Sequence, residues 1–212
     1  MDRFFLILFT LIVFTVYGAM FHFAPKVKRF QVETEGQMSY GLDSAKVNVI
    51  VFEEFACFQC RRFHNEVMPE LFGKYVNTGK VKLTLIPVAY LDPSLPAFSA
   101  ACCISKLGPK YLKAFLDHVF EMSDKEMSTL SARELAASFA STAPKISLNE
   151  ILQCTKSSHI EEEREKSIAQ ATALYDENIH MPTLLVNGRI VSPLDKQSVF
   201  STIEKELYDQ KK

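Results

Sequence analysis

The sequence lacks an excess of charge of either sign. Its 212 residues have a formal net charge of −1 and a sequence pI of about 6.5. There is therefore no basic face to suggest nucleic acid and no acidic tail to suggest a strongly charged partner. Internal repeats and low-complexity tracts are also missing. We expect one folded domain, since the chain is long enough for one sizeable core and has little room for two.

A second CxxC motif and a histidine pair at metal-ligand spacing are missing as well. The chain has five cysteines, an odd number, so at least one thiol stays unpaired in a monomer. Cys57 and Cys60 form the one CxxC motif, and a tetrahedral structural zinc needs two further ligands at suitable spacing. We expect no metal and no cofactor. The cysteines indicate redox chemistry, with a metal site as the alternative.

Charged residues are absent from residues 4–24. As a helix this segment would span about 30 Å, which is enough to cross a bilayer. Tyr17 and His22 occupy the −3 position for cuts after Ala19 and Ala24, where a signal peptidase prefers small residues. We therefore expect residues 1–24 to be an uncleaved anchor, with a cleaved signal peptide as the alternative.

The flanks of this segment oppose export. Lys26, Lys28 and Arg29 follow it and only Arg3 precedes it, whereas positive flanks tend to stay in the cytoplasm. The expected export therefore depends on the chemistry of the cysteines and not on the flanks.

The rest of the chain divides into a polar tether, residues 25–39, and a folded domain, residues 40–210. Lys46 to Phe55 is rich in β-branched and aromatic residues and predicts a central strand buried on both faces. Apolar residues recur at helical spacing from Phe58 to Tyr75. Val81 to Pro87 predicts a second strand, which completes a βαβ unit.

The second half of the domain begins after a helical insertion. Residues 97–178 contain several helical segments and no strand candidate. An Asn187-Gly188 turn then predicts a hairpin over 183–191, because this pair accepts the positive φ angles of a two-residue turn. An apolar stripe from Val199 to Leu207 predicts a final helix.

Cys57 lies where the first strand meets the following helix. A sulfur there faces unpaired backbone N–H groups and the positive end of the helix dipole, which lowers a thiol pKa. Cys57 is therefore the expected nucleophile, a thiolate near neutral pH, and Cys60 the resolving thiol.

Residues 52–60 (FEEFACFQC), followed by Arg61-Arg62-Phe63-His64, resemble the active-site strand and helix of DsbA-like thiol–disulfide oxidoreductases. Residues 181–188 (MPTLLVNG) resemble the cis-proline loop and hairpin of that family. The resemblance covers about residues 40–210. It implies an α/β thioredoxin-like fold with an inserted helical subdomain, preceded here by the transmembrane or signal segment.

The resemblance also implies roles for residues and partners. Pro182 would be cis, and Met181 would face the cysteine pair and offer backbone groups to an extended substrate as an added strand. The substrates would be unfolded or reduced exported proteins, and an unidentified membrane redox partner would reset the pair. The place of action would be the periplasm, with residues 4–24 in the inner membrane.

The dipeptide between the cysteines departs from the commonest pattern of the family. Phe58 and Gln59 supply neither the proline nor the histidine of strongly oxidising relatives, so we expect a weaker thiolate and a weaker oxidant. Glu53 and Glu54 would add to this effect. We expect both as solvated strand-end carboxylates, with proton relay to Cys60 as the alternative.

The remaining cysteines lie in the insertion. Cys102 and Cys103 are adjacent on one predicted helix and cannot both face the same neighbour. A bridge from one of them to Cys154 and three free core cysteines stay open as alternatives. The histidines are expected to be structural or at the surface, with His180 the one weak candidate for a catalytic role.

The function predicted from the sequence is a weakly oxidising dithiol oxidase that exchanges disulfides with exported proteins. The alternatives are a disulfide reductase or isomerase and, from another class, a metal-binding carrier on a thioredoxin scaffold.

Overall fold

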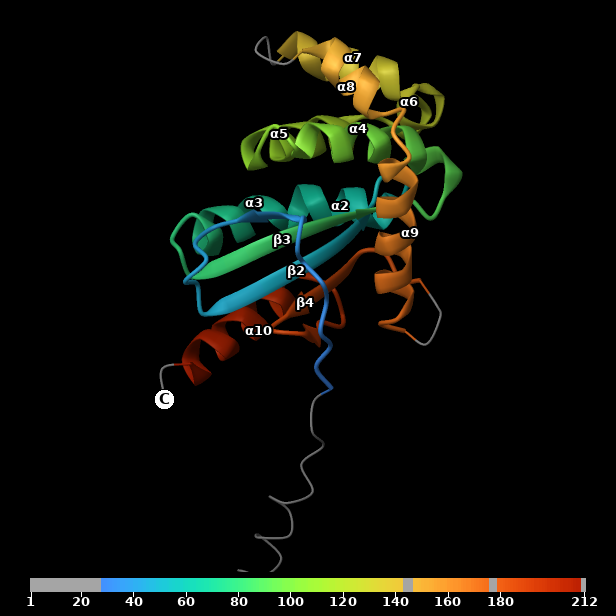
Figure 1. The fold of residues 1–212 in the computed structure, drawn as a ribbon. Helices are drawn as coiled ribbons and strands as arrows, with labels where there is room; N and C mark the ends of the chain where they lie inside the picture. The colour runs from blue at the N-terminus through green and yellow to red at the C-terminus, as the bar shows by residue number, and fades with distance from the viewer. Residues whose placement is uncertain (1–27, 143–146, 176–178, 211–212) are drawn as a thin grey trace, which may run out of the picture.

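A central sheet of five strands organises the protein (Figure 1). The computed structural model describes residues 28–142, 147–175 and 179–210. The strand order is β1-β3-β2-β4-β5, with β2 and β3 parallel and the other neighbours antiparallel. The strands are β1 (Met38–Tyr40), β2 (Val47–Glu54), β3 (Val81–Val88), β4 (Thr183–Val186) and β5 (Arg189–Ile190).

The helices before the insertion follow the first long strand. Apolar spacing predicted one helix from Phe58 to Tyr75, but the structure divides it into three short segments, and Pro69, which has no N–H to donate, lies in the first turn of the second. These segments are α2 (Phe58–Glu66), α3 (Met68–Leu71) and the π-helix η1 (Phe72–Val76).

The insertion is helical, as predicted, and it stacks beyond α2 (Figure 1). A 3₁₀ turn leads into it, α9 returns the chain from it to the sheet, and α10 ends the domain. The elements are η2 (Asp92–Ser94), α4 (Leu95–Ser105), α5 (Pro109–Glu121), α6 (Asp124–Thr129), α7 (Ala132–Thr142), α8 (Leu148–Cys154), α9 (His159–Thr172) and α10 (Lys196–Asp209).

Alternation along β2 divides the core between the two faces of the sheet. Val49 and Val51 belong to a large cluster with α2, α3, η1, α10 and the insertion helices. Phe52 belongs to a smaller cluster with residues of α9 and with the partly buried Phe30 and Val32. Both faces of β2 are therefore buried, as the uninterrupted apolar run predicted.

A disulfide between Cys103 and Cys154 joins α4 to α8, with the two Cα atoms 5.8 Å apart. Of the arrangements that the sequence left open, this is the one in the structure. Cys102, the preceding residue on α4, is a free thiol. Burial raises its pKa to about 12, so it is a weak nucleophile at neutral pH.

The expected tether differs from the structure at its C-terminal end. Met38–Tyr40 form β1, which pairs with β3, and the Phe30 N–H donates to the Gly188 carbonyl at 2.7 Å. Arg29 forms an ion pair with the buried Glu206 at 2.7 Å. The folded domain therefore begins before residue 40. So short a strand has too few residues to show an alternating pattern.

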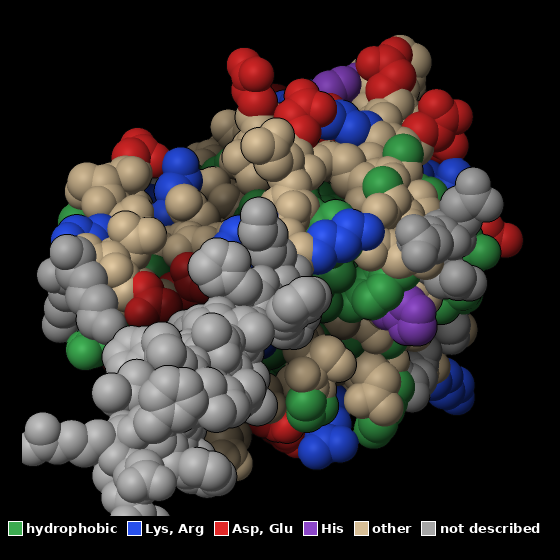
Figure 2. All heavy atoms as spheres, turned by 90° about the horizontal axis from the view of Figure 1, so that it is seen from below, with side chains coloured by type: hydrophobic (Ala, Val, Ile, Leu, Met, Phe, Trp, Pro, Cys, Tyr) green, Lys and Arg blue, Asp and Glu red, His purple; other side chains and the backbone are tan. Residues whose placement is uncertain are grey.

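The expected anchor, residues 4–24, lies outside the described residues. Within the described ranges, no helix is both long and apolar enough to cross a membrane. On the face shown in Figure 2, acidic and basic side chains of the described residues are interspersed.

Candidate active site

Cys57 is the residue at which β2 ends and α2 begins. It caps α2 in an extended conformation (φ −96°, ψ 118°), and its carbonyl accepts a hydrogen bond from the Arg61 N–H at 3.1 Å. The thiol is half-buried. Cys57 therefore has a partly accessible sulfur at the start of α2, directly after β2. The order of strand, cysteine and helix in the sequence predicted this position.

The environment of Cys57 stabilises its thiolate. A hydrogen bond from the Cys60 thiol is the largest cause, backbone N–H groups of Cys60 and Gln59 add to it, and partial burial opposes it. Together they lower the pKa of Cys57 to about 6. Cys57 is therefore mainly a thiolate at neutral pH, which is the form that attacks disulfides and leaves from them.

Cys60 has the opposite environment. Its side chain is fully buried, and its sulfur accepts a hydrogen bond from the Glu54 N–H at 3.2 Å. Burial raises the pKa of Cys60, and the hydrogen bond to Cys57 and the Cys57 charge raise it further. Of the two cysteines of the pair, Cys57 is thus the one that an incoming sulfur can reach.

The structure brings Met181 and Pro182 to this pair although more than a hundred residues separate them in the chain. The Met181–Pro182 peptide bond is cis, as the resemblance implied. The Cys57 thiol faces the Met181 carbonyl, with 3.6 Å between sulfur and oxygen. The loop before β4 therefore places its backbone directly beside the accessible cysteine.

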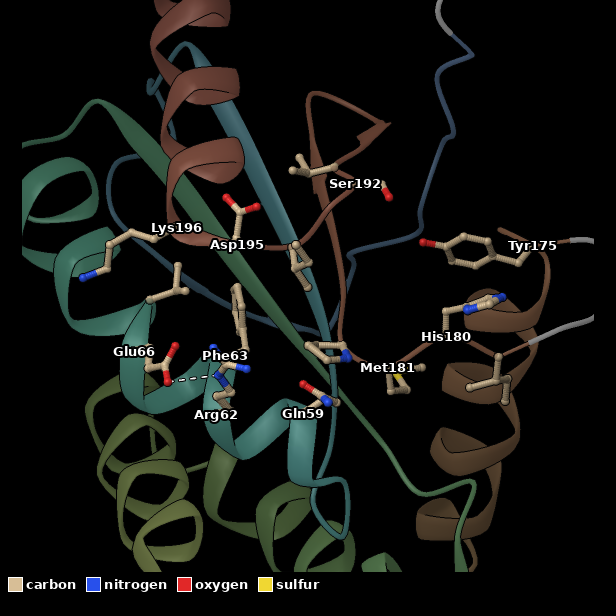
Figure 3. Close-up of a pocket in the computed structure, with 15 residues that line it drawn as sticks. Gln59, Arg62, Phe63, Glu66, Tyr175, His180, Met181, Ser192, Asp195 and Lys196 are labelled. Carbon is tan, nitrogen blue, oxygen red and sulfur yellow. Dashed lines mark hydrogen bonds and ion pairs between the residues drawn. The ribbon is translucent and has the colours of Figure 1, made fainter.

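A groove of about 770 Å³ opens beside Gln59 and Met181 (Figure 3). One wall is α2, and the other comes from the loop of His180 to Pro182 and from the chain entering α10. Gln59 lines the groove. Phe58 is 62% exposed at the surface instead. Gln59 therefore contributes to the groove, whereas Phe58 contributes to the exposed surface outside it. The lining residues are Gln59, Arg62, Phe63, Glu66, Val67, Tyr175, Ile179, His180, Met181, Pro182, Val191, Ser192, Leu194, Asp195 and Lys196.

The expectation that Glu53 and Glu54 are solvated was wrong. Their exposed fractions are only 3% and 2%. The Glu54 carboxylate accepts hydrogen bonds from the N–H groups of Tyr90, at 2.9 Å, and Leu91, at 3.4 Å. Burial raises the pKa of Glu54, and these hydrogen bonds oppose the rise. The sequence did hold a signal for this burial, because both residues belong to a segment that was expected to be covered on both faces.

Two histidines lie near the site. His180 packs against Tyr175 with 4.4 Å between ring centroids and lines the groove. His64 is buried and pairs with Asp117 of α5. Sequence reasoning had left open whether His64 was structural or at the surface, because its carboxylate partner lies far along the chain.

Within the described ranges, no group of three or more His, Cys, Asp or Glu residues is arranged to hold a metal ion. The chemistry that the described site supports is thiol–disulfide exchange at Cys57 with Cys60 as the second sulfur.

Comparison with known proteins gives related sequences and folds. A family model described as thioredoxin matches residues 33–205. A probable disulfide bond formation protein D of Bacillus anthracis is 30% identical over 174 residues, which are 81% of this chain and 78% of the relative.

Two crystal structures share the fold. Oxidised BdbD of Bacillus subtilis has a TM-score of 0.75 at 24% identity, over 87% of this chain and 100% of that chain. Chlamydia trachomatis DsbA has a TM-score of 0.71 at 23% identity, over 88% of this chain and 97% of that chain.

Proposed function

Because this chain belongs to the thioredoxin family and is a thiol–disulfide oxidoreductase of the DsbA-like type, we propose that it oxidises dithiols of exported proteins through Cys57 and Cys60. One observation supports this assignment above the others. An accessible thiol of low pKa lies beside a fully buried partner thiol and faces the cis-proline loop. This arrangement suits a sulfur that is attacked by substrate and later leaves it.

The reaction begins with the Cys57–Cys60 disulfide. A substrate thiolate attacks the Cys57 sulfur, the bond between the two cysteines breaks, and its electron pair stays on Cys60, which takes up a proton. A second substrate thiolate then attacks the substrate sulfur of the mixed disulfide, and Cys57 leaves as a thiolate. The substrate loses two electrons and the protein gains them. The low pKa of Cys57 favours this departure.

Substrate would be aligned by main-chain contacts. The backbone of Met181 lies beside Cys57 and can pair with an extended segment as an added strand. The groove beside Gln59 then receives side chains that flank the substrate cysteine. Phe58, which is largely exposed, offers an apolar contact outside the groove.

The low pKa of Cys57 is the basis for the proposed direction of the reaction. A lowered Cys57 pKa stabilises the reduced form, and this makes the disulfide an oxidant. Since the dipeptide supplies no positive charge, we infer a weakly oxidising dithiol oxidase. A reductase or isomerase would use the same geometry at a more reducing potential.

The place of action follows from the substrates. We infer the periplasm, with residues 4–24 as the membrane anchor and a cleaved signal as the alternative. The disulfide between Cys103 and Cys154 supports an oxidising compartment, because such bonds are rare in the cytosol. A membrane redox partner would reoxidise the pair after each turnover.

Trapping of mixed disulfides tests the proposed roles. The Cys60→Ala variant should accumulate disulfides between Cys57 and reduced exported proteins, because no second thiol releases them. Cys57→Ala should accumulate none. Cys102→Ala is the matched control and should behave like wild type. Equal trapping by Cys57→Ala and Cys60→Ala would contradict the assignment.

A further inference from the structure

The chain segment before β1 is tied to α10 and to the turn between β4 and β5. The Arg29 guanidinium donates to the carbonyl of Asn187 and to the carboxylate of Glu206, both at 2.7 Å. The side-chain amide of Asn187 donates to the other oxygen of Glu206 at 2.9 Å. Glu206 is only 6% exposed. Arg29 is therefore held by two elements of the folded domain.

The residues after Arg29 continue this attachment. The Phe30 N–H donates to the Gly188 carbonyl at 2.7 Å. A Cβ at position 188 would lie 2.5 Å from the Phe30 carbonyl oxygen, so this close approach requires glycine. Phe30 and Val32 pack into the smaller of the two core clusters. The segment from Arg29 to Val32 thus belongs to the folded domain.

A short length of chain separates this attachment from the expected anchor. Residues 4–24 end five positions before Arg29. An extended chain covers at most about 3.6 Å per residue, so Arg29 lies within about 18 Å of the point where such an anchor leaves the bilayer. The turn at Asn187-Gly188, which Arg29 and Phe30 contact, is therefore kept near the membrane.

The cysteine pair lies at the other end of β2. Asn187 pairs with Asn48, at the start of β2, through two hydrogen bonds of 2.8 Å. Cys57 instead follows the end of that strand at Glu54. Six residue steps of about 3.3 Å each place Asn48 and Glu54 roughly 20 Å apart. Most of the length of the sheet therefore separates the attachment from the catalytic cysteine.

The surface around the attachment suits a lipid headgroup region. Tyr208, in the last turn of α10, is 60% exposed, and tyrosine is enriched at membrane–water interfaces. The exposed Lys46, just before β2, donates to the Gln210 carbonyl at 3.4 Å. Figure 1 shows α10 and the start of the described chain on the side of the sheet away from the insertion. We call this surface, made of Lys46, the turn at 187–189 and the last turn of α10, the tethered end.

A second surface with exposed apolar side chains surrounds the catalytic cysteine. Phe58, Tyr90 and Leu91 have exposed fractions of 62%, 55% and 44%. The N–H groups of Tyr90 and Leu91 donate to the Glu54 carboxylate. Phe58 follows Cys57 directly, so all three side chains belong to the catalytic end of the sheet. A membrane against them would cover Cys57, which has to remain accessible to exported proteins.

We propose that the tethered end faces the bilayer and that the contacts of Arg29 and Phe30 hold the domain in this orientation, with Cys57 away from the membrane. This inference rests on the proposed anchor, residues 4–24. The lipid surface is the partner of the tethered end, and the catalytic end stays open to reduced exported proteins.

Photo-crosslinking to lipid tests the orientation. The full-length chain is inserted into vesicles of phosphatidylethanolamine and phosphatidylglycerol. A benzophenone maleimide is attached to one cysteine at a time, either Cys57 or Lys46→Cys, with every other free cysteine replaced by alanine. Lys46→Cys should label lipid several times more strongly than Cys57. Arg133→Cys, at an exposed position of α7 in the insertion, is the control and should label as weakly as Cys57. Equal labelling of Lys46→Cys and Cys57, or stronger labelling of Cys57, would overturn the inference.

A change in the length of the attachment tests whether it sets the orientation. A flexible Gly-Ser linker of about ten residues between residues 27 and 28 adds about 17 Å of mean reach and leaves every described contact in place. It should reduce the difference in labelling between Lys46→Cys and Cys57. Arg29→Gln should act in the same direction. Lys166→Gln is the matched control, because it breaks the ion pair with Glu33 at 3.1 Å, which lies after the attachment, and it should change nothing. Labelling that neither the linker nor Arg29→Gln alters would contradict the proposed attachment.

Retention in the membrane separates this inference from the proposed function. A chain that an alkaline carbonate wash removes from the vesicles has no anchor, and this would contradict the anchor and the orientation together. A retained chain that labels lipid equally from both ends would contradict the orientation alone. Alkylation of Cys57 reports the redox role independently of both results.

Discussion

Replacing Cys60 with alanine removes the thiol that donates to Cys57, and this hydrogen bond is the largest cause of the low Cys57 pKa. With the pKa lowered from 9.0 to about 6, the thiolate fraction at pH 7 is about 90%, against about 1% for an ordinary thiol. In Cys60→Ala the pKa of Cys57 should rise, and its reactivity at neutral pH should fall accordingly. Cys60→Ser retains a donor and should show a smaller rise.

The assay is the rate of Cys57 alkylation as a function of pH. It is best made in a Cys102→Ala background, so that in the Cys60 variants Cys57 is the one free thiol of the chain. The wild-type rate should reach half its maximum near pH 6, where Cys57 titrates. A wild-type midpoint near 9, or equal midpoints in wild type and Cys60→Ala, would refute the assignment of the Cys60 hydrogen bond as the cause.

Three further changes have defined outcomes. Gln59→His should make the disulfide more oxidising by stabilising the Cys57 thiolate, and an unchanged potential against glutathione would contradict this. Removing the Cys103–Cys154 bridge, which spans 51 residues, with two alanines should reduce the free energy of unfolding by about 2–4 kcal/mol in denaturant titrations and leave the Cys57 alkylation midpoint unchanged. Burial opposes the charge of His64, but the carboxylates beside it outweigh burial and raise its pKa from 6.5 to about 9, so His64 should contribute stability fully below about pH 6.5 and lose it as the pH rises through about 9. The melting temperature of the oxidised protein should fall over that range, and it should fall less in His64→Gln.

Local patterns predicted most of the fold. The apolar run before Cys57 became β2, and the Asn187-Gly188 turn, with φ angles of 47° and 79°, became the predicted hairpin. The position of Cys57 followed from the order of strand and helix alone. In each case a short stretch of chain determines the backbone geometry.

The partners of the buried carboxylates did not follow from local patterns, although the apolar run of β2 did hold a signal for their burial. Glu53 and Glu54 are polar residues at the end of a strand, and solvation is the ordinary outcome for such residues. Their burial depends on segments distant in sequence, namely α5, which supplies Asp117 beside His64, and the loop at Tyr90. Contacts of this kind require the tertiary structure.

The redox equilibrium of Cys57 and Cys60 with glutathione tests the central claim most directly. Thioredoxin-fold proteins range from about −270 mV for a reductant with a cysteine pKa near 7 to about −120 mV for a strong oxidant with a pKa near 3.5. With the Cys57 pKa at about 6, we predict a two-electron equilibrium between these limits, with both cysteines oxidised together. A potential at or below the reducing limit, or a pair that does not exchange with glutathione, would contradict a dithiol oxidase.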